Sequence, residues 1–205
     1  MTRIRHPSKH SSHLTFWLGL LAAAAVIAGF FLYSGMQAEK KKTGQFNPIK
    51  PVPSDSVLRS TLKEEQYRVT RENGTETAFR NEYWDNQRPG IYIDVITGDA
   101  LFSSTDKFDA GTGRPTFTKP ISPDRVFEKS DSSFGMDRTE VRATKSNSHL
   151  GHVFNDGSPP TGRRYAINSV ALRFIPLEKM QAEGYAEYLS LFPKPEGEQQ
   201  TAEGK

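Results

Sequence analysis

Cysteine is absent from all 205 residues of the chain. This absence excludes disulfide scaffolds, thiolate zinc sites, iron–sulfur clusters and every cysteine nucleophile. It leaves the redox compartment open, because a chain without thiols is compatible with the cytosol and with an oxidising space. Any chemistry of this protein must therefore rest on other side chains.

A large charge excess of one sign is also absent, since 27 Lys and Arg stand against 24 Asp and Glu. The net charge of +3 comes from residues 1–45, which hold six bases and one acid, whereas the remaining 160 residues carry a net charge of −2. The main part of the chain therefore lacks the basic face of a nucleic-acid-binding protein, and we expect no nucleic-acid partner. The length allows one ordinary domain with additional segments.

One long hydrophobic run is present, from Leu14 to Tyr33, and it contains 20 residues without a charge. A helix of about 20 residues crosses a bilayer, and Trp17 and Tyr33 lie where interfacial aromatic residues are favoured. A cleaved secretory signal has a shorter apolar core, about 7–15 residues, followed by a small-x-small cleavage site. The run is too long for that alternative and Met36-Gln37-Ala38 is a poor site, so we predict an uncleaved transmembrane helix at 14–34.

The remaining segments follow from composition. Basic residues flank the span on both sides, so the positive-inside count is nearly a tie, but a long domain is translocated largely regardless of its charge. We therefore expect a single-pass membrane protein with its domain on the extracytoplasmic, periplasmic side. The predicted order is a basic tail at 1–13, the span at 14–34, a proline-containing linker at 35–55, a domain at 56–195 and a disordered tail at 196–205.

The domain is predicted to consist of short strands with a helix at each end. Thr61-x-x-Glu64 has the pattern of a capping box and predicts a short helix through Arg68, and the amphipathic segment 177–192 predicts a closing helix that ends before Pro193. Strand patterns lie between them at 90–97, 138–143, 151–154 and 163–175. No strand pattern alternates with a long helix, which indicates an antiparallel β domain with peripheral helices.

The last predicted strand carries a candidate site. Side chains alternate along a strand, so Arg164, Ala166 and Asn168 share one face near its start. Further along the same face the pattern predicts core positions at Val170, Leu172 and Phe174. Arg164 and Asn168 thus lie on either side of the small residue Ala166, an arrangement that indicates a functional site. The alternative is that these two polar side chains only pair with neighbouring loops.

Two histidines precede this strand. His149 and His152 lie three residues apart, and Asp156 follows in a predicted turn. The spacing is compatible with metal ligation, but the ligands that would complete a tetrahedral zinc site are missing. Imidazoles on a turn are equally suited to catalysis or hydrogen bonding, and ordinary core or surface histidines are the third alternative.

The order of several segments points to a family. The chain resembles a B-type peptide methionine sulfoxide reductase, a SelR domain, over about residues 56–195. The segments that carry the resemblance are QYRVTRENGTE (66–76), GIYIDVITGDALFSSTDKFDAGTGRPTF (90–117), MDRTEVRATKSNSHLGHVFNDG (136–157), TGRRYAINSVALRFIP (161–176) and EGYAEYL (183–189). The resemblance implies a mainly β fold of two antiparallel sheets in an open, tent-like arrangement with peripheral helices. It also implies protein repair by thiol-dependent reduction of peptide methionine R-sulfoxide.

The resemblance places the family nucleophile at Ala166. In the family a cysteine thiolate attacks the sulfoxide sulfur there and becomes a sulfenic acid, which a second thiol resolves, with thioredoxin usually the final reductant. A methyl group cannot accept the oxygen, so this step is not available to the chain. The common position of a resolving cysteine is Thr112.

The other family site residues are partly retained. The resemblance assigns hydrogen bonding of the sulfoxide oxygen to His149, His152 and Asn168, stabilisation of the thiolate to Arg164 and support of the site to Asp156. It places Phe154 in substrate contact, and it places Arg114 where the family has a tryptophan against the substrate's S-methyl group. The positions of a structural zinc site in some members are Asp94, Thr97, Ala143 and Ser146, so we predict no metal and no cofactor.

Two explanations of Ala166 remain. In the first, the chain is a pseudoenzyme that acts as a binding or assembly subunit of a membrane complex. In the second, it is an active peptide-methionine (R)-S-oxide reductase represented here as a Cys→Ala variant. A change made only to remove reactivity would leave the tryptophan in place, so its replacement by Arg114 favours the pseudoenzyme.

Arg114 also suggests what such a protein binds. A guanidinium in place of an indole puts a cation at the pocket mouth, and with Arg164 and the two histidines it favours an acidic peptide or a chain terminus. The alternatives are a methionine-sulfoxide peptide, or a vestigial pocket in which Arg114 pairs with an acid such as Asp109. The expected partners are thus the membrane, through residues 14–34, proteins of a membrane complex and one of these peptides.

Overall fold

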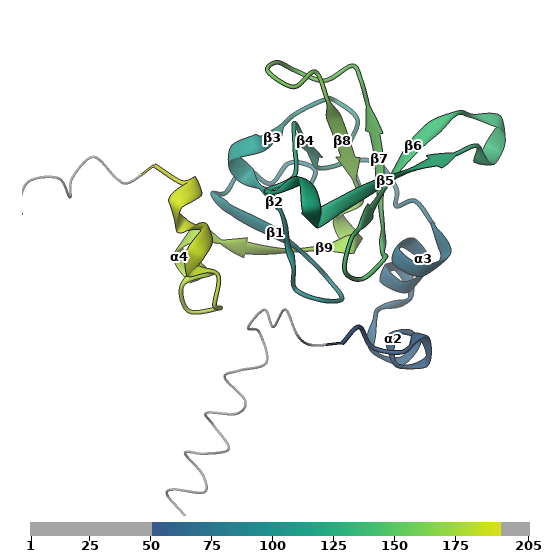
Figure 1. The fold of residues 1–205 in the computed structure, drawn as a ribbon, viewed down its shortest axis with the longest axis horizontal. Helices are drawn as coiled ribbons and strands as arrows, with labels where there is room; N and C mark the ends of the chain where they lie inside the picture. Colours follow the sequence, from purple (N-terminus) through teal and green to yellow (C-terminus); the bar gives the residue numbers. More distant parts are fainter. Residues whose placement is uncertain (1–50, 194–205) are drawn as a thin grey trace, which may run out of the picture. The chain divides into compact units, whose positions relative to one another are not determined.

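The computed structural model describes residues 51–193, which form two antiparallel β-sheets (Figure 1). The three-stranded sheet has the order β2-β1-β9, with β1 at Gly90–Asp94, β2 at Ala100–Ser103 and β9 at Leu172–Pro176. The six-stranded sheet has the order β3-β4-β8-β7-β6-β5. Its strands are β3 (Lys107–Phe108), β4 (Thr116–Phe117), β5 (Val126–Asp131), β6 (Arg138–Ala143), β7 (His149–Phe154) and β8 (Arg164–Ile167).

The mainly β fold with two antiparallel sheets is the fold class that the sequence predicts. The predicted transmembrane helix at 14–34, the linker as far as residue 50 and the tail at 196–205 lie outside the described residues. Within residues 51–193, no helix has the length and apolar character needed to cross a membrane.

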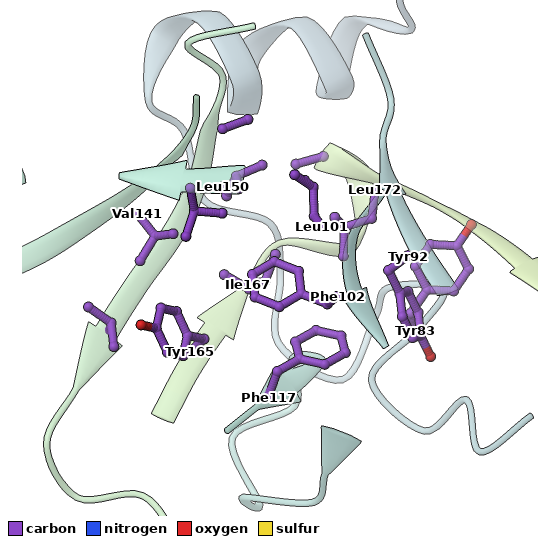
Figure 2. Close-up of a cluster of buried hydrophobic side chains, with 14 of the residues drawn as sticks. Tyr83, Tyr92, Leu101, Phe102, Phe117, Val141, Leu150, Tyr165, Ile167 and Leu172 are labelled. Atoms are coloured by element: carbon purple, nitrogen blue, oxygen red, sulfur yellow. The ribbon is translucent and has the colours of Figure 1, made fainter. Parts of the chain in front are cut away.

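The main core lies between the two sheets (Figure 2). Side chains alternate across each strand, so Tyr92 of β1 and Phe102 of β2 meet Phe117 and Tyr165 of the larger sheet. The rings of Phe102 and Phe117 stack with their centroids 4.5 Å apart. The sequence alternation that places Tyr165 and Ile167 in this core leaves Ala166 on the opposite face of the larger sheet.

A second cluster covers the other face of the three-stranded sheet. Ile91 and Ile93 alternate with Tyr92 and pack with Ile175 against the C-terminal segment. The short helix α4 (Leu177–Met180) and the 3-10 helix η5 (Ala186–Leu191) supply its cover. The smaller sheet is therefore covered on both faces.

The predicted closing helix over 177–192 is wrong as a single element. It is interrupted at Gly184, whose φ of 88° lies in the left-handed region that glycine adopts without strain. The segment folds as α4 and η5 on either side of this glycine.

The first predicted helix begins later than expected. Thr61 is the last residue of α2 (Asp55–Thr61), and α3 runs from Glu64 to Glu72. The side chain of Gln66 accepts a hydrogen bond from the backbone N–H of Lys63 at 3.1 Å. This contact closes the start of α3 in the way expected of a capping-box glutamine, and α3 then packs against β7.

The strand predicted at 163–175 is in fact two strands that belong to different sheets. β8 and β9 are separated by the 3-10 helix η4 (Ser169–Ala171). The carboxylate of Glu76 accepts the backbone N–H groups of Ser169 at 2.7 Å and Val170 at 3.0 Å, which holds the chain in this bend. Residues after Asn168 therefore reach the core from the smaller sheet.

Candidate functional site

Ala166 lies at the centre of a row of residues on the outer face of the six-stranded sheet. It pairs with His152 on one side and Thr116 on the other, and His152 pairs in turn with Glu140. Opposed residues of antiparallel strands have their side chains on the same face. The position that the resemblance assigns to the family nucleophile is thus flanked by an imidazole and a hydroxyl.

A β-bulge brings the two histidines to one face. Both belong to strand β7, which begins at His149 and not at the predicted residue 151, and an odd spacing in a regular strand would place them on opposite faces. The register shifts at Leu150, because Gly151 pairs with Val141 and His149 pairs with the next residue, Arg142. The extra residue turns the imidazoles towards each other, with ring centroids 5.5 Å apart.

His149 is a buried, neutral imidazole. Its Nδ1 is 2.7 Å from Oε1 of Glu140, which also accepts a hydrogen bond from Arg142. Burial raises the pKa of Glu140, but the hydrogen bonds from His149 and Arg142 outweigh it and hold this pKa below its usual range. Burial lowers the pKa of His149. The ionised carboxylate therefore accepts the Nδ1–H, and Nε2 is left as a buried acceptor without a partner among residues 51–193.

His152 is held by the β5–β6 hairpin, which projects from the body of the domain (Figure 1). Its Nε2 is 2.7 Å from Oδ2 of Asp131, and Arg138 donates to the same oxygen at 2.8 Å. Hydrogen bonds from Ser133 and His152 hold the pKa of Asp131 far below its usual range. Because an ionised carboxylate only accepts, the Nε2–H of His152 is the donor.

Arg164 is engaged by an acid. Its Nε and Nη2 donate to the two carboxylate oxygens of Asp156 at 2.8 and 3.0 Å. The guanidinium carbon lies 4.2 Å from the ring centroid of Phe154. The hydrogen bond from Arg164 lowers the pKa of Asp156, so the pair is ionised and its charges compensate each other.

Asn168 is bound to the backbone. Its Oδ1 accepts the N–H of Glu76 at 3.1 Å, and its Nδ2 donates to the carbonyl of Leu150 at 3.0 Å. The side chain thereby fixes the segment around Glu76 beside β7. One amide hydrogen of Asn168 remains for another acceptor.

These elements enclose a pocket of about 180 Å³. Five of the residues expected at the site line it, and Thr75, Arg138 and Gly151 join them. The five are Arg114, His152, Phe154, Ala166 and Asn168. Three expected residues do not line the pocket, namely His149, Asp156 and Arg164. His149 is hydrogen-bonded to Glu140, and Arg164 lies over the ring of Phe154, so both act on the pocket indirectly. The pairing of β7 with β8 links these residues to the lining.

Gly151 makes the close pairing at the pocket floor feasible. A Cβ at this position would lie 2.1 Å from the carbonyl oxygen of Ala166. A side chain at 151 would therefore push β7 away from β8 at the centre of the site.

Arg114 enters the pocket from a tight turn. Gly113 has a φ of 70°, and its carbonyl accepts hydrogen bonds from the backbone of Phe79 at 2.9 Å and from the side chain of Asn81 at 2.7 Å. Arg114 donates from Nη2 to the backbone carbonyl of Glu76 at 3.1 Å. Asp109 accepts the N–H of Gly111 instead, and residues 51–193 contain no ion pair between Arg114 and Asp109.

Several residues of this site are not among the predicted ones, including Gly151 in the lining and the acids Asp131 and Glu140 behind the histidines. Thr75 and Arg138 line the pocket, and Glu76 lies behind it with a pKa that burial raises. The alternation of Arg138, Glu140 and Arg142 along β6 was the available signal, since it places three charged residues on one face. Glu76 offered none, because its partners are backbone groups 93 and 94 residues away in the chain.

The four positions that the resemblance assigns to a zinc site of some members meet in two adjacent turns. Oδ2 of Asp94 accepts a hydrogen bond from Thr97 at 2.9 Å, Oδ1 accepts the N–H of Ile96 at 2.9 Å, and the Ser146 side chain is also hydrogen-bonded to this carboxylate. Burial raises the pKa of Asp94. In the described part of the chain, no three His, Asp or Glu side chains are grouped to hold a metal ion.

A larger cavity of about 520 Å³ lies beside Trp84 and Lys107 and contains none of the expected site residues. Lys107 donates to the carbonyl of Trp84 at 3.1 Å. We place the candidate site at the smaller pocket, because the hydrogen-bonded acids and imidazoles converge there.

Comparison with known proteins agrees with this geometry. The SelR domain family matches residues 62–176. A protein of Vibrio cholerae serotype O1 named "Peptide methionine sulfoxide reductase MsrA/MsrB" is 54% identical over 153 residues, which cover 74% of this chain and 40% of that protein. The chain thus spans well under half of the length of this relative. Since the family match covers more than half of the chain, the protein belongs to the SelR domain family, that of the B-type methionine-R-sulfoxide reductases.

Proposed function

We propose that this protein is a membrane-anchored member of the SelR family that binds a partner through its pocket and does not reduce methionine sulfoxide. In this function residues 14–34 anchor the chain and the domain serves as a binding or assembly subunit of a membrane complex on the extracytoplasmic side. The observation that carries the proposal is Ala166, which stands at the centre of the outer face of the larger sheet.

The reduction needs a sulfur nucleophile, because the oxygen of the sulfoxide ends on that sulfur as a sulfenic acid. Ala166 offers a methyl group, and the whole chain contains no cysteine that could replace the missing thiolate from another position. The imidazoles, the asparagine and the arginine of the site cannot accept the oxygen. The proposed protein therefore keeps the site and lacks the redox step.

The surrounding hydrogen bonds support a retained binding role. Glu140, Asp131 and Asp156 each hold a site cation or imidazole at 2.7 to 2.8 Å. Glu140 and His149 are both buried, so removal of either one would leave the other in the interior without its partner, which is strongly destabilising. These contacts keep the pocket in one shape without any redox chemistry.

An assay of the purified full chain tests the proposal. With dithiothreitol and a peptide containing methionine R-sulfoxide, we expect no turnover above the rate without protein. The variant Ala166→Cys restores the nucleophile beside His152 and Asn168, so we expect it to gain a measurable thiol-dependent rate. Thiol-dependent reduction by the unchanged chain would overturn the proposal.

The intact array of paired side chains favours one alternative, an active peptide-methionine (R)-S-oxide reductase represented here as a Cys→Ala variant. Sequencing of the encoding gene separates the two. An alanine codon at position 166 supports the non-reducing protein, and a cysteine codon assigns the reductase activity.

A further inference from the structure

The pocket contains two guanidinium groups with uncommitted donors. Arg114 and Arg138 both line it, and in each the Nε–H is buried without an acceptor among the described residues. Buried N–H groups are normally hydrogen-bonded. Because these Nε–H groups are buried, a bound molecule meets the terminal N–H groups of the guanidiniums, and in Arg114 the bonded one is Nη2, which donates to the carbonyl of Glu76.

The charges around the pocket favour an anion. Arg138 shares Asp131 with His152, and Arg164 is compensated by Asp156. Arg114 contacts only a backbone carbonyl of Glu76, whose carboxylate is occupied by two backbone N–H groups. No carboxylate of residues 51–193 is at ion-pair distance from Arg114, and the carboxylate of Glu76 attracts it only from beyond that distance.

The groups expected to hydrogen-bond a sulfoxide oxygen are largely committed. His149 donates its Nδ1–H to Glu140 and His152 donates its Nε2–H to Asp131. Asn168 donates one of its two amide hydrogens to Leu150. The donors that remain in the pocket are thus mainly those of the guanidinium groups.

The dimensions of the pocket suit a side chain. Its volume of about 180 Å³ is smaller than the roughly 300–1,000 Å³ of sites for drug-sized ligands. Phe154 supplies an apolar wall, fixed from behind by the Arg164 guanidinium, against which methylene groups can pack.

We infer that the pocket binds a carboxylate carried by a peptide, with Arg114 as the main ionic partner and Arg138 as a second donor. The planar guanidinium matches the carboxylate geometry with two parallel N–H···O hydrogen bonds. This inference rests on the proposed binding function and names its ligand class. The carboxylate belongs to an acidic side chain or to a chain terminus, and the experiment below distinguishes these two sources.

The test measures fluorescence anisotropy of labelled peptides with the full chain in detergent micelles. Three peptides with blocked termini differ only in a central glutamate, glutamine or methionine R-sulfoxide, and a fourth has a central glutamine and a free C-terminal carboxylate. We expect a carboxylate peptide to bind saturably and about tenfold or more tightly than the blocked glutamine peptide, as a charge-assisted hydrogen bond requires. Glutamate preference identifies a side-chain carboxylate, and preference for the free terminus identifies a chain end.

Variants of Arg114 assign the binding to this pocket. Arg114→Gln should abolish the carboxylate preference, Arg114→Lys should retain part of it, and Arg114→Trp should shift the preference towards the sulfoxide peptide. The control Arg88→Gln removes a guanidinium that is 61% exposed and paired with Glu178, and it should bind like the unchanged chain. Circular dichroism confirms that each variant is folded.

Equal affinity for the glutamate and glutamine peptides, tighter binding of the sulfoxide peptide by the unchanged chain, or no saturable binding would overturn the inference. Unaltered carboxylate preference in Arg114→Gln would overturn it as well. Saturable sulfoxide binding without turnover would refute the carboxylate ligand and leave the proposed non-reducing function standing, whereas only turnover by the unchanged chain refutes that function.

Discussion

At the scale of single residues, Glu140 stabilises the site although it does not line the pocket. One of its oxygens accepts hydrogen bonds from both His149 and Arg142, and all three side chains are buried. Arg142 also contacts Asn73 and Asn147. An uncompensated charge in such a position is strongly unfavourable, so the acid matters more for the fold than an acid at the surface.

Glu140→Gln is expected to lower the free energy of unfolding by about 3 kcal/mol, because it leaves Arg142 buried without its ionic partner. The control Glu178→Gln removes a pair with Arg88 that is more than half exposed, and the expected change is below about 1 kcal/mol. Urea unfolding followed by circular dichroism measures both. Equal changes in the two variants would contradict the role given to Glu140.

The neutral state of His149 makes stability depend on pH. Its pKa is lowered by burial in the folded chain, whereas in the unfolded chain it is about 6.5. Above that pH neither state is protonated at this residue. As the pH falls below it, the unfolded state takes up a proton that the folded state does not, so the free energy of unfolding should decrease, by at most about 1.4 kcal/mol per pH unit.

Urea unfolding between pH 7 and pH 5.5 measures this slope, with His149→Gln as the control because it cannot titrate. The slope of the unchanged chain is expected to exceed that of the variant. Equal slopes would show that His149 is not a buried neutral imidazole.

The residues of the pocket differ in how far sequence could place them. Ala166, His152 and Asn168 lie in segments with a strand pattern and a family resemblance, and from these two signals we predicted that they share one site. All three line the pocket. Their partners could not be predicted in the same way, because Asp131 and Glu140 come from another hairpin and act through distances that depend on strand register. The engagement of Arg164 by Asp156 likewise follows from geometry and not from composition.

At the scale of elements, the sequence predicted a strand best where the pattern of residues along that strand itself sets its bounds. The strand predicted at 138–143 is β6 with the same bounds, while that at 90–97 ends at Asp94 and that at 151–154 begins at His149. The prediction failed at 163–175, where an apolar pattern continues through a bend. A distant carboxylate makes this bend, so a local pattern could not reveal it.

The bend between β8 and β9 should depend on Glu76. Glu76→Ala leaves the N–H groups of Ser169 and Val170 without their acceptor, each loss costing about 1–3 kcal/mol. We therefore expect a loss of about 2–6 kcal/mol in the free energy of unfolding. Glu76→Gln keeps one acceptor oxygen and should lose about half as much.

Urea unfolding of both variants checks the role of Glu76. A loss in Glu76→Ala no larger than in Glu76→Gln would show that the carboxylate does not hold the bend.

At the scale of the whole molecule, charge and hydropathy divide the chain. The first 45 residues contain the net positive charge and the uncharged run of 20 residues, and the rest of the chain is slightly acidic. Residues 51–193 contain no helix able to cross a membrane. The predicted anchor lies at residues 14–34. This separation lets anchoring and pocket binding be tested independently.

The full chain is expected in the membrane fraction after expression in bacteria, and it should resist extraction with alkaline carbonate because a 20-residue apolar helix spans the bilayer. Replacing Ala24 and Ile27 by Asp places two charges in the middle of the run and should prevent stable insertion. The control Ala24→Leu with Ile27→Leu keeps the run apolar and should remain in the membrane. Carbonate extraction of the unchanged chain would contradict the predicted anchor.

The position of Ala166 also makes the protein suited to site-specific labelling. With no thiol in the chain, a cysteine introduced at 166 would be the sole target of a maleimide, and it would report from the pocket lined by Arg114, His152 and Asn168. Any molecule that occupies the pocket should slow that labelling in proportion to its occupancy. The chain is thus a cysteine-free background in which one substitution at position 166 gives a readout of ligand binding.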